Sequence, residues 1–255
     1  MYLAHSDQFR FKAFKKAMLN PEVKAIWCLR GGYGANRLLP EIEKMSVPKI
    51  KKLLIGFSDV TSLHNLINQK WKWPSLHASL IDRLASGRLS EINLDELKSS
   101  LLNFEHGATF KNLIPLNKAA LKNQKIDSRV IGGTLMVVAS SLGTPSQIKT
   151  KDLILFLEEI GERAYRIDRC LHQLKQAGLF KDVAAVVFGD FTNCLEADGK
   201  DLVPQTLENF FREIKIPAFR GIEAGHGETQ RPLFFNTQTV LTCGSNSQMI
   251  NFGPK

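Results

Sequence analysis

The chain has 255 residues, 44% of them hydrophobic, which is enough to bury one large or two modest cores. No apolar run approaches the roughly 20 residues that a membrane-spanning helix needs, and the N-terminus lacks the apolar segment of a secretory signal, so we expect a soluble, cytoplasmic protein without a membrane partner. The formal net charge of +9 is compatible with nucleic acid or an acidic substrate, but no nucleic-acid-binding motif accompanies it, and we expect no nucleic-acid partner.

The first part of the chain alternates helical and strand patterns. Residues 7–19 predict a surface helix, with Phe11, Phe14 and Met18 on one face and the lysines elsewhere. Further elements are expected in chain order: a strand at 24–29, a helix at 36–45, a strand at 51–57 and a helix after Ser58. This alternation predicts a parallel sheet with helices packed on it.

The second half is also mixed. Residues 152–160 and 183–191 predict strands, 166–178 and 205–214 predict helices, and 239–245 is rich in β-formers. We therefore predict an α/β protein with an N-terminal parallel-sheet domain over 1–104 and a C-terminal mixed α/β domain over 129–255. The segment 105–128 has weak periodicity and is predicted as a linker between them.

The stretch "LLIGFSDVTSLHNLI" (53–67) predicts a buried strand, a sharp turn and a helix, with Ser58 in the turn. A serine on such a strand-to-helix turn can act as a nucleophile beside the helix N-terminus, as in α/β hydrolases, although Val60 replaces the second glycine of G-x-S-x-G. Helix capping by Ser58 and Asp59 explains the same pattern, and from this stretch alone it is the stronger interpretation.

A serine nucleophile needs a histidine base and a carboxylate that orients it. His226, in "EAGHGE", is flanked by glycines after a probable strand, which leaves its imidazole in an open loop or in a simple turn. Glu158 and Glu159 end an apolar strand, and alternation lets only one of them point into a given cleft; a solvated acidic turn is the alternative.

The sequence does not predict a metal site or a cofactor. The four cysteines are scattered without a CxxC pair, which is typical of buried free thiols, and the acidic residues near His226 do not have the spacing of an HExxH set. The glycine-rich stretch "CLRGGYGANRLLP" (28–40) lacks the ending of a P-loop. Its backbone N–H groups could instead contribute to an oxyanion hole or hold a substrate carboxylate, while tight turns explain part of it.

Taken together, several stretches in this order resemble the LD-carboxypeptidase family, serine peptidases that include muramoyltetrapeptide carboxypeptidases and the microcin C self-immunity proteins. The resemblance covers about residues 20 to 235. The stretches that carry it are "AIWCLRGGYGANRLLP", "GFSDVTSLH", "GGTLMVVASSLGTP", "ILFLEEIGERAYRIDRCLHQLKQAG", "VFGDF" and "GHG".

The resemblance implies roles for particular residues. Ser58 is expected as the nucleophile, His226 as the base and Glu158 as the orienting carboxylate, in a cleft between the two domains. It also implies an oxyanion hole built from the backbone N–H groups of Asp59 and Gly32. The candidates for binding the substrate carboxylate are Arg30, Gly31 and Arg166.

The implied reaction is metal-independent release of the terminal D-alanine from a murein tetrapeptide by a cytoplasmic enzyme, with a muropeptide as the small-molecule partner and a homodimer as the assembly. An immunity-type amidase acting on peptidyl-nucleotides and an inactive, truncated binding protein are the alternatives. Three departures from the family pattern stand out: an apparently shortened N-terminus, His77-Ala78-Ser79 in place of His-Gly-Pro, and Gly132-Gly133-Thr134 in place of Gly-Gly-Asn.

Overall fold

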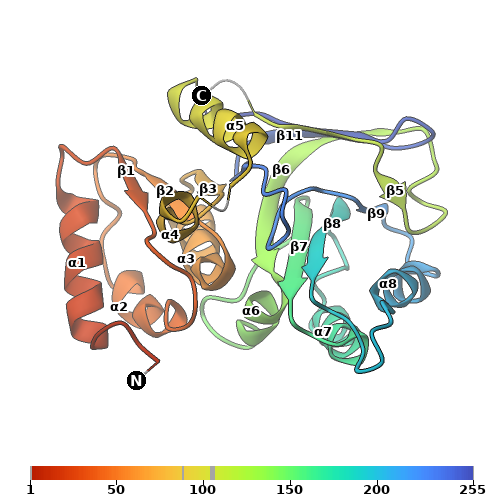
Figure 1. Cartoon of the computed structure of the whole chain (residues 1–255), viewed down its shortest axis with the longest axis horizontal. Helices are drawn as coiled ribbons and strands as arrows, with labels where there is room; N and C mark the ends of the chain where they lie inside the picture. The colour runs from red at the N-terminus through yellow and green to blue at the C-terminus, as the bar shows by residue number, and fades with distance from the viewer. Residues whose placement is uncertain (1, 88, 104–106, 255) are drawn as a thin grey trace.

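The computed structural model describes residues 2–87, 89–103 and 107–254 and contains two β-sheets with helices packed against them (Figure 1). The four-stranded first sheet has the order β1-β2-β3-β10, and β1, β2 and β3 run parallel, as the sequence predicts. Its strands are β1 (Ala25–Trp27), β2 (Leu53–Gly56), β3 (Ser75–His77) and β10 (Leu233–Phe235).

Helices cover both faces of the first sheet. They are α1 (Asp7–Leu19), η1 (Asn36–Leu38), α2 (Leu39–Glu43), η2 (Ser58–Val60), α3 (Thr61–Leu66), the π-helix η3 (Ile67–Trp71), α4 (Ile81–Ala85) and α5 (Glu91–Leu102). The predicted apolar face of α1 is confirmed, because Met18 is buried in the core with Phe11 and Phe14 packed beside it. The Ser6 hydroxyl caps this helix by accepting a hydrogen bond from the Phe9 backbone N–H.

The second sheet has eight strands in the order β4-β12-β11-β6-β7-β8-β9-β5, with β6 to β9 parallel in its centre and antiparallel strands outside them. The strands are β4 (Thr109–Lys111), β5 (Ile114–Pro115), β6 (Lys125–Thr134), β7 (Ile154–Ile160), β8 (Ala185–Thr192), β9 (Ala218–Arg220), β11 (Gln238–Thr242) and β12 (Gln248–Asn251).

The central strand β7 separates two hydrophobic cores. Leu155 and Leu157 point to the face covered by α6 (Leu135–Ser140), α7 (Ala164–Gln176) and α8 (Val203–Phe211), and Phe156 points to the opposite core with Phe235. Because β7 is buried on both faces, it is an almost continuous apolar run, which is typical of a parallel sheet covered on both sides. This alternation also sends Glu158 and Glu159 to opposite faces.

The predicted domain boundaries need two corrections. Much of the segment predicted as a linker, 105–128, forms β4, β5 and the start of β6 in the second sheet, while its residues 105 and 106 lie outside the described ranges. In addition, β10 of the predicted C-terminal domain pairs antiparallel with β3, so it covers an edge of the first sheet with the buried Phe234 and Phe235. The strands β4, β5 and β10 are short, and their position is determined by the strands with which they pair rather than by a periodic sequence pattern.

No helix in the described part of the chain is long and apolar enough to cross a membrane. All four cysteines are free thiols, and Cys170, Cys194 and Cys243 are buried as expected. Burial raises the pKa of the partly buried Cys28 to about 12, which leaves this thiol uncharged and unreactive at neutral pH.

Candidate active site

Ser58 lies on a strained turn between β2 and α3. The strand ends at Gly56, Phe57 is extended, and Ser58, the first residue of η2, takes a positive φ of 65°. A non-glycine residue in this left-handed region costs about 1 kcal/mol and is uncommon. Ser58 is half-buried whereas Phe57 is buried, so the turn leaves the serine side chain accessible at the edge of the sheet.

The glycine-rich loop after β1 runs directly against this turn. A Cβ atom on Gly31 would lie 3.1 Å from the Ser58 Cβ and 3.3 Å from its Oγ, so only a residue without a side chain leaves the serine this space. The Asp59 carboxylate accepts a hydrogen bond of 2.7 Å from the Ala35 backbone N–H and ties the two segments together. Burial raises the pKa of Asp59.

Glu158 and His226 form a direct pair at the carboxyl end of β7. His226 Nδ1 lies 2.6 Å from Glu158 Oε2; the Glu158 side chain is 0% exposed and that of His226 12% exposed. A Cβ on Gly225 would approach Glu158 Oε2 to 2.9 Å, and Gly225 has a φ of 134°, so both space and conformation require glycine before the histidine. The glycine flank that singled out His226 therefore has a structural reason.

The other carboxylate oxygen of Glu158 has its own partner. The Thr134 hydroxyl donates a short hydrogen bond to Glu158 Oε1, and Thr134 is paired with Glu158 in the register of β6 and β7. From the sequence, Thr134 stands out only as a departure from the family pattern. Its position at the end of an apolar strand is the feature from which its place near Glu158 could have been predicted. The carboxyl ends of neighbouring parallel strands meet at one edge of the sheet.

Close packing brings the serine turn to the Glu158–His226 pair. The Thr134 backbone N–H donates to the Thr61 hydroxyl at 3.1 Å, and a Cβ on Gly133 would come within 2.3 Å of the same oxygen. The Phe57 ring, next to Ser58 in the chain, lies 4.7 Å from the His226 ring between centroids. The turn that carries Ser58 thus packs beside the Glu158–His226 pair at the junction of the two sheets.

Glu159 has a different environment from Glu158. Its two carboxylate oxygens accept hydrogen bonds from the backbone N–H groups of Met136, at 2.8 Å, and Ile160, at 2.9 Å. Burial raises the pKa of Glu159 to about 7. Glu159 therefore satisfies backbone groups near the start of α6, while Glu158 meets the histidine.

Asp190, near the carboxyl end of β8, is a neighbour that the sequence analysis did not single out. Burial first, and then the charge of Glu158, raise its pKa to about 7. Its Oδ2 atom is buried without a hydrogen-bond partner among the described residues, and a Cβ on Gly227 would lie 2.5 Å from this oxygen. Asp190 thus supports the loop that carries His226.

Of the residues predicted for the oxyanion hole and for binding the substrate carboxylate, Gly31 lies close to Ser58, whereas Gly32, Arg30 and Arg166 are exposed. Gly32 is exposed with a φ of 97°, and Gly31 rather than Gly32 makes the close approach to Ser58. Arg30 is exposed beside Gly31. Arg166 lies on an exposed face of α7, where it contacts Glu162 and Tyr165 of its own segment.

Comparison with known proteins identifies the family to which the chain is similar. Residues 1–78 match the model of the LD-carboxypeptidase N-terminal domain, and residues 127–241 match that of the C-terminal domain. A Rickettsia conorii protein that carries a carboxypeptidase name is 38% identical over 251 residues, which are 98% of this chain and 78% of the relative. The probable murein peptide carboxypeptidase of Bacillus subtilis is 32% identical over 99% of this chain and 79% of its own length.

More distant matches share the fold as well. The crystal structure of muramoyltetrapeptide carboxypeptidase from Oxalobacter formigenes superposes with a TM-score of 0.82 at 27% identity, over 99% of this chain and 86% of that one. The microcin C7 self-immunity protein MccF of Escherichia coli is 26% identical over 88% of this chain and 73% of its own length. With both domain models matched and such identities over nearly its whole length, the chain belongs to the LD-carboxypeptidase family of serine peptidases.

Proposed function

We propose that this protein is a metal-independent serine LD-carboxypeptidase that releases the terminal D-alanine from murein tetrapeptide by cleavage after diaminopimelate, in cell-wall recycling. The observation that carries the proposal is the direct Glu158–His226 pair beside the strained turn of Ser58, whose neighbour Phe57 packs on the His226 ring. Two relatives support this substrate class by name: the Bacillus subtilis protein is a probable murein peptide carboxypeptidase, and the Oxalobacter formigenes protein is a muramoyltetrapeptide carboxypeptidase.

Acylation begins with proton transfer. An ionised carboxylate only accepts hydrogen bonds, so His226 donates through Nδ1 to Glu158 and keeps Nε2 as the basic nitrogen. Nε2 takes the Ser58 hydroxyl proton as the serine oxygen attacks the carbonyl carbon between diaminopimelate and D-alanine. The buried Glu158 stabilises the imidazolium that forms, and His226 then protonates the departing amine of D-alanine.

The negative charge that develops on the substrate oxygen needs donors already in position. The backbone N–H groups of Asp59 and Gly32 are proposed as these donors, because both residues belong to segments that meet at Ser58. Water, deprotonated by His226, then attacks the acyl-serine ester, which releases the shortened peptide and restores the Ser58 hydroxyl.

The experiment is a D-alanine release assay on murein tetrapeptide, run with the wild type and with Ser58→Ala. We expect D-alanine from the wild type only, at a rate that EDTA does not change. Retained activity in Ser58→Ala contradicts the nucleophile assignment, and strong inhibition by EDTA contradicts metal independence.

A second candidate function is cleavage of a peptidyl-nucleotide amide, which the similarity to MccF supports. A peptidyl-sulfamoyl-nucleoside, offered in a parallel assay, separates the two: turnover of this compound alone favours the amidase. If the wild type turns over neither substrate, an inactive binding protein is favoured. The cytoplasmic location, the homodimer and the substrate contacts of Arg30 and Arg166 stay predictions.

A further inference from the structure

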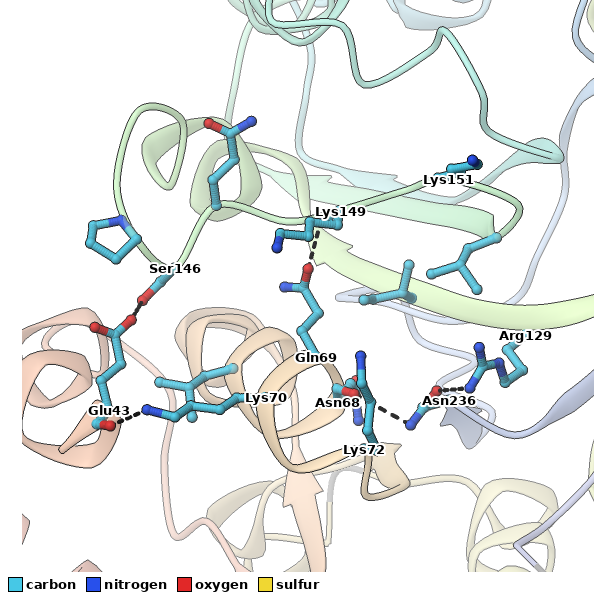
Figure 2. A pocket seen from close by; sticks show the side chains of 15 residues that line it. Glu43, Asn68, Gln69, Lys70, Lys72, Arg129, Ser146, Lys149, Lys151 and Asn236 are labelled. Carbon is cyan, nitrogen blue, oxygen red and sulfur yellow. Dashed lines mark hydrogen bonds between the residues drawn. The ribbon is translucent and has the colours of Figure 1, made fainter. Parts of the chain in front are cut away.

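A large cavity lies between segments of the two sheets, and Ser58, Glu158 and His226 are not among its lining residues. Its volume is about 550 Å³, within the range of small-molecule sites. One wall comes from the end of α3 and from η3, and the other from β6 and the segment that precedes β7 (Figure 2). The cavity therefore lies between parts of the chain that are far apart in the sequence.

The charge of this cavity is strongly one-sided. Five cationic side chains line it and one carboxylate does, that of Glu43; the cations are Lys70, Lys72, Arg129, Lys149 and Lys151. Glu43 is already engaged, because its carboxylate accepts a short hydrogen bond from Ser146 and its backbone carbonyl accepts one from Lys70. Glu43 therefore balances one of the five positive charges, and four are left without an acidic residue in the lining.

Among the described residues, none of the remaining cations forms an ion pair with an acidic side chain. Arg129 donates through Nη1 to the neutral Asn236 Oδ1 at 3.0 Å. Lys72, Lys149 and Lys151 take part in none of the ion pairs between residues that the structure describes. The four positive charges repel one another, and a multiply charged anion bound between them reduces this repulsion.

Cross-sheet hydrogen bonds hold the two walls in place. The Lys149 backbone N–H donates to Gln69 Oε1 at 2.6 Å, and the Asn236 side chain donates to the Asn68 carbonyl at 3.4 Å (Figure 2). The lining also contains the half-buried Leu153 and the exposed Pro145, whereas Leu66 and Ile131 belong to the buried cores beside the cavity. An apolar surface with cations around it suits a ligand that has an organic part and a charged part.

We propose that this cavity binds a small organic polyphosphate, such as a nucleoside triphosphate, with its phosphates on Lys72, Arg129, Lys149 and Lys151. Lysine ammonium groups and the arginine guanidinium are the side chains that bind phosphate most often in proteins. Leu153 and Pro145 contact the organic part. This site is separate from the proposed peptidase reaction, so a ligand here does not compete with the peptide substrate.

The test is calorimetric titration of the full chain with ATP at physiological ionic strength. We expect saturable binding at one site per chain, weakened roughly threefold to tenfold by Arg129→Ala or by Lys149→Ala, and more strongly by both together. Lys215→Ala is the matched control, because it removes an exposed lysine elsewhere and should leave ATP affinity unchanged. Circular dichroism and urea unfolding of each variant verify that it is folded.

A second measurement separates the site from the catalytic residues. Ser58→Ala should bind ATP as the wild type does, and excess murein tetrapeptide should not displace the nucleotide. On ATP addition, NMR signals of the Gln69 and Lys149 amides should shift. Absence of saturable binding, displacement by the peptide, or equal weakening by Lys215→Ala would each overturn the proposal.

Discussion

His226 Nδ1 and Glu158 Oε2 are 2.6 Å apart, and the carboxylate of this pair is completely buried. A buried carboxylate is tolerated only when hydrogen bonds replace its water shell, and here a histidine and a threonine hydroxyl, that of Thr134, supply them. The pair therefore fixes both the orientation and the tautomer of the imidazole.

Glu158→Gln should lower kcat by about 10⁴-fold, because a neutral amide neither fixes the required tautomer nor stabilises the imidazolium. Steady-state D-alanine release measures this effect. Glu159→Gln is the matched control, since the same change one residue along the strand lies on the opposite face and should leave kcat within about threefold of the wild type. Equal losses in the two variants would contradict the triad assignment.

Thr134→Val should lower kcat about tenfold with little change in KM, because it keeps the shape of the side chain and removes the hydroxyl that donates to Glu158. Thr134→Ser retains the hydroxyl and should restore most of the rate. A purely structural role for Thr134 predicts lower stability in both variants instead, so unfolding midpoints are measured beside the kinetics.

Ser58→Gly should be more stable than Ser58→Ala by about 1 kcal/mol, because glycine adopts the positive φ of this turn without strain and alanine does not. Both variants should be inactive. Urea denaturation with the linear extrapolation method gives the difference. If alanine is as stable as glycine here, the turn stores no strain.

Gly31→Ala should reduce kcat about tenfold or more without unfolding the protein, because the added methyl would lie 3.1 Å from the Ser58 Cβ and displace the serine. The backbone of Gly31 does not have a positive φ, so conformation adds no cost of its own. The assay is D-alanine release, with circular dichroism as the folding control. Wild-type kcat in this variant would show that the loop moves away freely.

Asp190→Asn should change how stability depends on pH. The pKa of Asp190 is raised from 3.8 to about 7, so the folded state holds its proton over a range in which the unfolded chain has lost it. The contribution of Asp190 to stability is therefore fully present below pH 3.8 and is lost as pH rises towards about 7. Relative to the wild type, the asparagine variant should gain more stability at pH 8 than at pH 5.

Urea unfolding of both proteins at these two pH values measures the gain. The variant should gain stability at high pH because the wild type must bury a charged carboxylate above the raised pKa of Asp190, whereas asparagine stays neutral at every pH. A difference between wild type and variant that does not change with pH would mean that Asp190 titrates normally in the folded protein.

Much of the fold and of the site could be predicted from the sequence because the signals are local. The apolar run of β7 and the helical pattern of α1 give their structures directly, and the glycine beside His226 marks a close approach that the backbone needs. Ser58, Glu158 and His226 are predicted as a triad because they occur, in this order, in stretches that resemble one family.

The features that could not be predicted are non-local. Thr134 and Asp190 are ordinary polar residues at strand ends, and only the register of neighbouring strands brings them near Glu158. The edge strand β10 is too short for a periodic pattern, and β4 and β5 form because partners from later in the chain pair with them. The cavity around Lys149 could not be predicted either, because its cationic side chains come from segments that are far apart in the sequence.

The position of His226 between β9 and β10 has a consequence for motion. The chain leaves the second sheet at β9, passes through the histidine, and enters the first sheet at β10. The imidazole therefore lies on the segment that connects the two sheets. The alignment of the base thus depends on the orientation of one sheet relative to the other, and we expect substitutions far from Ser58 that alter this orientation to change the rate.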